Sequence, residues 1–192
     1  QRTDLAKSLL IGLLEARPRR DAAVRAELLL ARILAGQGET GRALEILGQV
    51  RDDASASDAV KAEASVVLAR VRAAEGDVAG GLDLIEGVLD GAPPPAPVRR
   101  RADLLRGWLL ISSGREDDGL PVMRTAIQGL RDDPFAASMQ LALAHRYFEE
   151  GRTKEALREY QHLLEVFEGT IGRAGALLGK GGCLRALERY EE

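Results

Sequence analysis

A turn-forming glycine recurs along this chain at intervals of 37 or 38 residues. The glycines are Gly38, Gly76, Gly114 and Gly151, and Glu188-Arg189-Tyr190 occupies the equivalent place near the end. A repeat of this length, inside a chain of 192 residues, is typical of an array in which every unit has the same supersecondary structure. The period therefore constrains the fold more than any local motif does.

Three further positions hold residues of constant size in each unit. Because two helix backbones approach closely only where no bulky side chain separates them, these columns predict a pair of antiparallel amphipathic helices around each turn. The column seven residues before the turn glycine is Ala31, Ala69, Gly107, Ala144 and, in the last unit, Gly181. The column five residues after it is Ala43, Gly81, Gly119 and Ala156, and four residues later stand Leu47, Ile85, Met123 and Tyr160.

The segment Ala137–Phe167 shows this pattern most clearly and resembles the tetratricopeptide repeat family. The matching residues are Ala144, Tyr147, Ala156 and Tyr160, with Gly181 and Leu184 in the last unit. The resemblance implies an all-α, right-handed solenoid of about ten helices, whose first helices line a concave face that binds a partner. The period exceeds the usual 34 residues, and the extra residues are expected in the linkers Arg51–Ser57, Asp90–Pro97 and Arg131–Pro134.

The periodicity divides the chain, as a single solenoid over 1–192, into four whole units between two partial ones. Because solenoids need polar caps and neither end resembles one, we expect the natural protein to continue on at least one side. The predicted parts are 3–18 (second helix of a truncated repeat), 22–57, 58–96, 97–133, 134–170 and 171–192 (first helix of a truncated repeat).

Proline or glycine residues change the expected local structure at three places in the chain. Pro121 falls inside a second helix and predicts that this helix is shortened or kinked. Gly80-Gly81 favours close packing of two helices over a hinge. The Pro-rich stretch Ala92–Val98 predicts a stiff, polyproline-like linker, which is also the composition that proline-binding modules recognise.

Composition excludes several classes of protein. The net charge is −3, so a nucleic-acid-binding protein is not expected, and no apolar run approaches the roughly 20 residues that span a membrane. The single Cys183 excludes an intramolecular disulfide, which leaves the compartment open between a bacterial cytoplasm and a periplasm or cell envelope. The bacterial interpretation rests on the Ala, Arg, Gly and Leu usage alone.

Catalysis has little support in the sequence. His145 and His162 lie on different predicted helices, and no His/Cys/Asp/Glu cluster has metal-ligand spacing. The glycines around Lys180 lack the other residues of a phosphate-binding loop, and Cys183 is expected to be a buried thiol. We therefore expect no enzyme activity, no cofactor and no metal.

The predicted concave face carries a line of arginines that runs into an aromatic patch. Guanidinium groups match carboxylates, and the sole tryptophan is a residue type that anchors interfaces. We therefore expect a peptide or protein partner with acidic groups and with an apolar side chain near Trp108. The alternative is that Trp108 fills the core and the arginines are only solvated. The candidate binding residues are Arg25, Arg32, Arg70, Arg101, Trp108, His145, Phe148 and Arg185, and the same register places Leu28, Glu63, Val66, Leu104, Leu141, Leu178 and Gly182 on this face.

The sequence thus predicts a non-catalytic scaffold or adaptor that holds a partner segment on its concave face. Two alternatives stay open at this point. One is a structural module that self-associates through exposed terminal helices. The other is an envelope module that takes part in polysaccharide binding or export.

Overall fold

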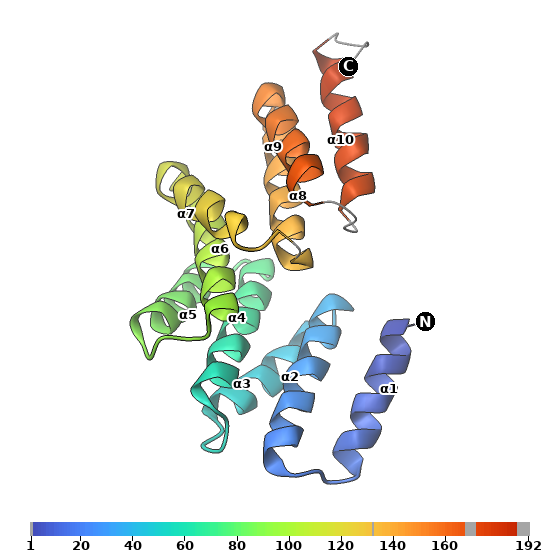
Figure 1. Ribbon diagram of the computed structural model, residues 1–192, viewed down its shortest axis with the longest axis vertical. Coiled ribbons are helices and arrows are strands. Elements are labelled where there is room, and N and C mark those ends of the chain that lie inside the picture. Colours follow the sequence, from blue (N-terminus) through green and yellow to red (C-terminus); the bar gives the residue numbers. More distant parts are fainter. Residues whose placement is uncertain (1, 132, 168–171, 188–192) are drawn as a thin grey trace.

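The computed structural model describes residues 2–131, 133–167 and 172–187, and this part of the chain consists of α-helices without strands (Figure 1). The prediction of an all-α fold is confirmed. The ten helices of these described residues are α1 (Arg2–Glu15), α2 (Arg20–Gly36), α3 (Thr40–Asp52), α4 (Asp58–Ala74), α5 (Val78–Asp90), α6 (Ala96–Ser112), α7 (Glu116–Gln128), α8 (Pro134–Glu149), α9 (Thr153–Val166) and α10 (Arg173–Ala186).

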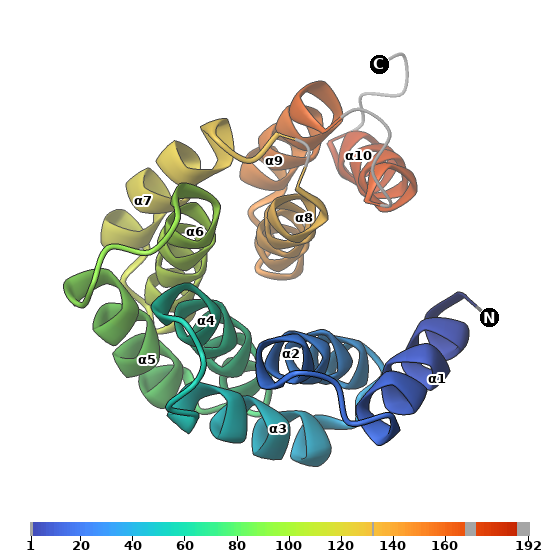
Figure 2. The same ribbon diagram turned by 60° about the horizontal axis from the view of Figure 1, so that its bottom comes forward.

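The helices form an arc of antiparallel pairs. Figure 2 shows α2, α4, α6 and α8 on the inside of the arc and α3, α5, α7 and α9 on the outside, with α1 and α10 at its two ends. Each inner helix packs along the outer helix that follows it. The inner helices therefore line the concave face of a solenoid, as the resemblance implies.

The four periodic glycines end the inner helices. Gly38, Gly76, Gly114 and Gly151 have φ angles of 80°, 94°, 87° and 74°, in the left-handed region that favours glycine. In each case the next residue donates its backbone N–H to the carbonyl five residues back; for Arg115 and Leu110 this distance is 2.8 Å. This bonding pattern is the Schellman motif, which satisfies carbonyl groups at a helix end and turns the chain sharply. The turn geometry explains why glycine recurs at this position.

The small-residue columns lie where the two helices of a pair cross. Ala31, Ala69, Ala144, Ala43 and Ala156 have no exposed surface. The large-residue column is buried beside them, with exposed fractions of at most 1% for Leu47, Ile85, Met123 and Tyr160.

The backbones of α6 and α7 approach each other closely where the two helices cross. A Cβ atom added at Gly107 would lie 2.8 Å from the carbonyl oxygen of Gly119, and one added at Gly119 would lie 2.5 Å from that of Gly107. A Cβ atom at Gly81 would likewise lie 2.9 Å from the Ala69 carbonyl oxygen, so Gly81 is a close-packing glycine, as its position predicts.

Two local predictions need correction. The helix that contains Pro121 is not shortened, because α7 has 13 residues, the same length as α3 and α5. Pro121 and Asp117 are both exposed, so water can donate to the Asp117 carbonyl that the proline leaves without an N–H partner. The Pro-rich linker is shorter than Ala92–Val98, because α6 already begins at Ala96 and Pro97 lies in its first turn. The Glu188-Arg189-Tyr190 segment lies outside the described residues.

The joint between α7 and α8 differs from the other joints. Whereas α3 packs along α4 and α5 along α6, α8 packs along α9 and against α6 and makes little backbone contact with α7. A polar cluster links the two units instead: Glu116 at the start of α7 accepts two hydrogen bonds from Arg152, at 2.7 and 2.8 Å, and one from the Tyr147 hydroxyl, at 2.9 Å. The Arg152 guanidinium also lies 4.2 Å from the centre of the Tyr147 ring.

A second polar cluster at the same joint involves a buried carboxylate. Glu159 on α9 is 6% exposed and accepts a hydrogen bond from Gln140 on α8 and one, at 3.1 Å, from Arg124 on α7. Together with the shared apolar core that runs from α6 to α10, the two clusters fix the position of α8 relative to the preceding unit.

Replacing Gly107 tests the close approach of α6 and α7. Gly107→Ala is expected to lower the free energy of unfolding by about 2 kcal/mol, because the added methyl group meets backbone atoms that cannot move aside. The control is Gly87→Ala on α5, where a Cβ atom has open space; it is expected to be neutral or to stabilise by up to about 1 kcal/mol. Urea unfolding measures both, and equal effects of the two substitutions would contradict the packing account.

The Glu116 cluster makes a prediction about pH. Hydrogen bonds from Arg152 and then from the Tyr147 hydroxyl lower the pKa of Glu116. A carboxylate with a lowered folded-state pKa stabilises the fold above its unfolded value of about 4.3 and loses this effect as the pH falls through the folded value.

We therefore expect Glu116→Gln to destabilise the protein by about 1 kcal/mol at neutral pH and by less in acid. Urea titrations of the wild type and the variant, from neutral pH into acid, give the difference in their free energies of unfolding. Glu45→Gln on the exposed surface of α3 is the matched control. If the free energies of unfolding of the wild type and Glu116→Gln differ by the same amount at every pH, the ionised Glu116 carboxylate does not stabilise the fold through this cluster.

Candidate functional site

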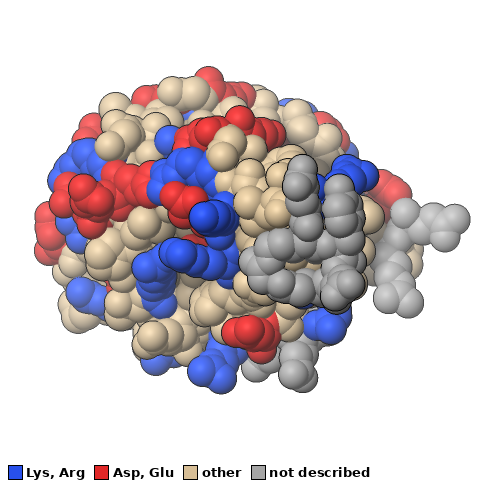
Figure 3. Space-filling view, turned by 90° about the horizontal axis from the view of Figure 1, so that it is seen from above, with Lys and Arg blue, Asp and Glu red and all other residues tan. Residues whose placement is uncertain are grey.

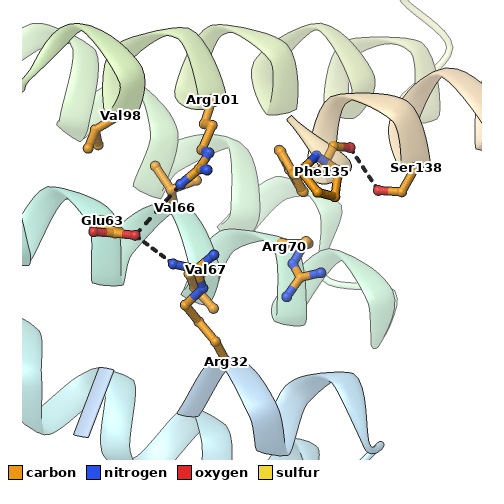
Figure 4. Close-up of a pocket in the computed structure, with 10 residues that line it drawn as sticks. Arg32, Glu63, Val66, Val67, Arg70, Val98, Arg101, Phe135 and Ser138 are labelled. Atoms are coloured by element: carbon orange, nitrogen blue, oxygen red, sulfur yellow. Dashed lines mark hydrogen bonds and ion pairs between the residues drawn. The ribbon is translucent and has the colours of Figure 1, made fainter. Parts of the chain in front are cut away.

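A cavity of about 270 Å³ opens on the concave face between four inner helices (Figure 4). We call it the concave pocket. Its walls are the side chains of Arg32 from α2, of Glu63, Val66, Val67 and Arg70 from α4, of Val98 and Arg101 from α6, and of Pro134, Phe135 and Ser138 from α8.

The floor of the pocket follows from helical spacing. Residues 63, 66, 67 and 70 lie three, one and three residues apart, so they share one face of α4. Val66 and Val67 are buried against the core, whereas Glu63 and Arg70 extend from the same face toward the cavity (Figure 4). Phe135 packs partly against the core and brings an aromatic ring to the opposite wall. The result is an apolar cavity with charged groups at its rim.

Two of the three arginines are paired with carboxylates. Glu63 accepts a hydrogen bond from Arg32 at 2.8 Å and lies 3.7 Å from Arg101. Arg101 also donates its Nε–H to Asp133 at 2.6 Å. Asp133 is the N-cap of α8, where its other carboxylate oxygen accepts the Phe135 backbone N–H at 2.9 Å. A ladder of opposite charges therefore crosses the concave face from α2 to the start of α8.

Arg70 is different. Within the described residues it has neither a hydrogen bond nor an ion pair, and its guanidinium lies 5.7 Å from the centre of the Phe135 ring. Burial, and then repulsion by Arg32, lowers the pKa of Arg70, but an arginine stays protonated at neutral pH. An unpaired cation that is partly withdrawn from water beside apolar side chains is suited to an anion with an apolar body.

The pocket contains three of the eight predicted binding residues, Arg32, Arg70 and Arg101. The other five do not line it. Trp108 is half-buried and packs against two core clusters. Arg25 and Arg185 are exposed. His145 is exposed with its ring edge-on to Tyr160, and Phe148 is exposed with its ring close to Gly182.

Two apolar residues that the register places on the concave face belong to the core. Leu28 is 4% exposed and Leu104 is fully buried. The inner helices contact both an outer helix and the neighbouring inner helices, for example α4 with α2 and α6. The stripe of each inner helix that reaches the concave surface is therefore narrower than expected.

Sequence reasoning missed the contribution of Pro134, Phe135 and Ser138 from the start of α8. A signal for two of them is present, because Phe135 and Ser138 stand 37 residues after Val98 and Arg101, the residues that line the pocket from α6. Extending the predicted face of α8 by about two turns, from Leu141 toward the start of the helix, would have included both residues.

Three further features of the described part of the chain concern metal binding, membrane crossing and thiol chemistry. It holds no group of three or more His, Cys, Asp or Glu residues that could bind a metal ion, and none of its helices has the length and apolar character needed to cross a membrane. Cys183 is buried, and burial raises the pKa of its thiol, which is the opposite of what a nucleophile needs. Figure 3 shows acidic and basic side chains side by side over one end of the solenoid, with neither sign covering that surface.

A family model for the tetratricopeptide repeat matches residues 28–97 and 141–192, more than half of the chain. The chain belongs to the tetratricopeptide repeat family. Proteins of this family bind other proteins or peptides and are generally non-catalytic, so membership indicates a protein–protein interaction scaffold.

Solved structures agree on the fold. BtubC from P. vanneervenii superposes with a TM-score of 0.65 at 12% identity, over 99% of this chain and 83% of that one. A mutant of MamA superposes with a TM-score of 0.50 at 18% identity, over 88% of this chain and 90% of that one. At such low identity these similarities concern the fold alone. A search of curated proteins finds no match.

Proposed function

We propose that this protein is a non-catalytic scaffold that binds a segment of a partner protein in the concave pocket. The segment presents a carboxylate to Arg70 and an apolar side chain to Val66, Val98 and Phe135. The observation that carries the proposal is the Arg70 guanidinium, which has no carboxylate partner among the described residues although Arg32 and Arg101 beside it do.

The apolar part of the partner is placed at Phe135 and not at Trp108. Phe135 lines the cavity and lies under Arg70, whereas Trp108 packs against the core. A guanidinium that lies over an aromatic ring keeps N–H groups available, and a carboxylate can accept two of them.

Self-association is a second candidate, favoured by a separate observation. Leu5, Leu9 and Leu13 are exposed along one side of α1, and Leu177 and Leu178 are exposed on α10. Contiguous exposed leucines are a surface type that proteins bury against one another. The polysaccharide alternative has less support, because the sole tryptophan, the residue expected to stack on a sugar, is half-buried against the core.

Affinity capture from an extract of the source cells tests the scaffold proposal. Wild-type protein is expected to retain a specific partner, and Arg70→Gln is expected to lose it, because the substitution removes the free cation without adding a new charge. The matched control is Arg42→Gln on the outer helix α3, an exposed arginine outside the pocket, and it is expected to retain the partner.

Recovery of the same partner by all three baits would place recognition outside the concave pocket and contradict the proposal. Recovery of only further copies of this chain would favour self-association, and a mass that rises with concentration in analytical ultracentrifugation would verify it. Circular dichroism of each variant shows that the fold is intact.

A further inference from the structure

The charges around the concave pocket nearly balance. The pocket lining contributes three positive side chains, Arg32, Arg70 and Arg101, and one negative side chain, Glu63. Asp133, which is hydrogen-bonded to Arg101 just outside the lining, contributes a second negative charge. One positive charge is left over, and the pairing assigns it to Arg70.

Glu63 lies between two of the three arginines of the pocket. Its Oε1 atom lies between Arg32 Nη1, at 2.8 Å, and Arg101 Nη1, at 3.7 Å (Figure 4). Its side chain is only 28% exposed, as is that of Arg101. The carboxylate therefore faces the cavity as a fixed counter-ion and is incompletely screened by water.

A fixed carboxylate in a partly buried cavity repels further negative charge. One carboxylate of a ligand can pair with Arg70 and leave the ladder intact. A second negative charge, whether on a neighbouring carboxylate or on the same phosphate group, finds no further unpaired arginine in the lining, because Glu63 pairs with Arg32 and Asp133 pairs with Arg101. Three arginines without Glu63 would instead favour a phosphate group, because guanidinium groups bind phosphates in the same bidentate way as carboxylates.

Resting on the function proposed above, we infer that Glu63 is a specificity-determining residue that restricts the concave pocket to an occupant with a single carboxylate next to an apolar side chain. Glu63 excludes phosphorylated segments and segments with two adjacent acidic residues. The single carboxylate comes either from an aspartate or glutamate side chain within the partner or from the end of the partner chain.

Binding of short synthetic peptides to the purified protein tests this inference. Two peptides with blocked ends differ only in the central residue of a Leu-X-Leu sequence, which is glutamate in one and phosphoserine in the other. A third peptide has glutamine at the centre and a free C-terminal leucine, so its only carboxylate is the chain end. Isothermal titration calorimetry gives the dissociation constant of each peptide for the wild type, Glu63→Gln, Arg70→Gln and the control Glu45→Gln.

The wild type is expected to bind a single-carboxylate peptide at least about tenfold more tightly than the phosphoserine peptide, which carries about two negative charges. Glu63→Gln is expected to tighten binding of the phosphoserine peptide by about tenfold. Glu45→Gln is expected to leave the dissociation constants of both the single-carboxylate and the phosphoserine peptides unchanged. Tighter binding of the glutamate peptide or of the free-end peptide identifies the source of the carboxylate.

Two outcomes would overturn the inference while leaving the proposed function intact. One is that the wild type binds the phosphoserine peptide most tightly, and the other is that Glu63→Gln leaves the order of affinities unchanged. The first comparison needs only the wild type, so it remains decisive if Glu63→Gln destabilises the fold. Failure of all peptides to bind, or undiminished binding to Arg70→Gln, would contradict the proposed function and this inference with it.

Discussion

The close approach of two helix backbones in each pair is the constraint on which the rest of this structure depends. Small residues at the crossing, such as Ala69 opposite Gly81 and Gly107 opposite Gly119, let the helices come into contact. The left-handed glycine after each inner helix then directs the chain back along it. Because every pair is built in the same way, stacking the pairs produces an arc whose inner helices share one concave face (Figure 2).

The concave pocket lies where this regular stacking is interrupted, beside the start of α8. The Glu116–Tyr147–Arg152 cluster and Glu159 link α8 and α9 to α7 through polar contacts. Asp133 fixes the start of α8 beside Arg101. Phe135 is thereby held opposite α4, where its ring supports Arg70. The interrupted stacking therefore brings the Phe135 ring and Arg70 together in one cavity.

The parts of the structure that depend on local spacing could be predicted from the sequence. Gly114 and Gly151 predict turns because their neighbours have helical periodicity, and Met123 and Tyr160 predict buried positions because the columns repeat. The pairing of Arg101 with Asp133 could not be predicted, because the two residues are 32 positions apart and meet only through the angle between units. Leu104 is predicted on the concave face but is buried, because the packing of neighbouring helices determines how wide a strip of each inner helix stays exposed.

The charge pairs of the pocket distinguish its three arginines in a way that a count of arginines would not reveal. Arg32 and Arg101 look equivalent to Arg70 in the sequence, yet among the described residues Glu63 and Asp133 pair with Arg32 and Arg101, whereas Arg70 has no carboxylate partner. The functional hypothesis therefore depends on one guanidinium group and on the apolar side chains around it.

NMR of the arginine side chains tests this central claim most directly. In isotope-labelled protein titrated with a peptide that carries one glutamate between two leucines, the Nε–H signal of Arg70 is expected to shift and saturate, while that of Arg42 on the outer surface stays unchanged. A titration in which the peptide binds but the Arg70 signal does not move would show that recognition takes place elsewhere on the solenoid.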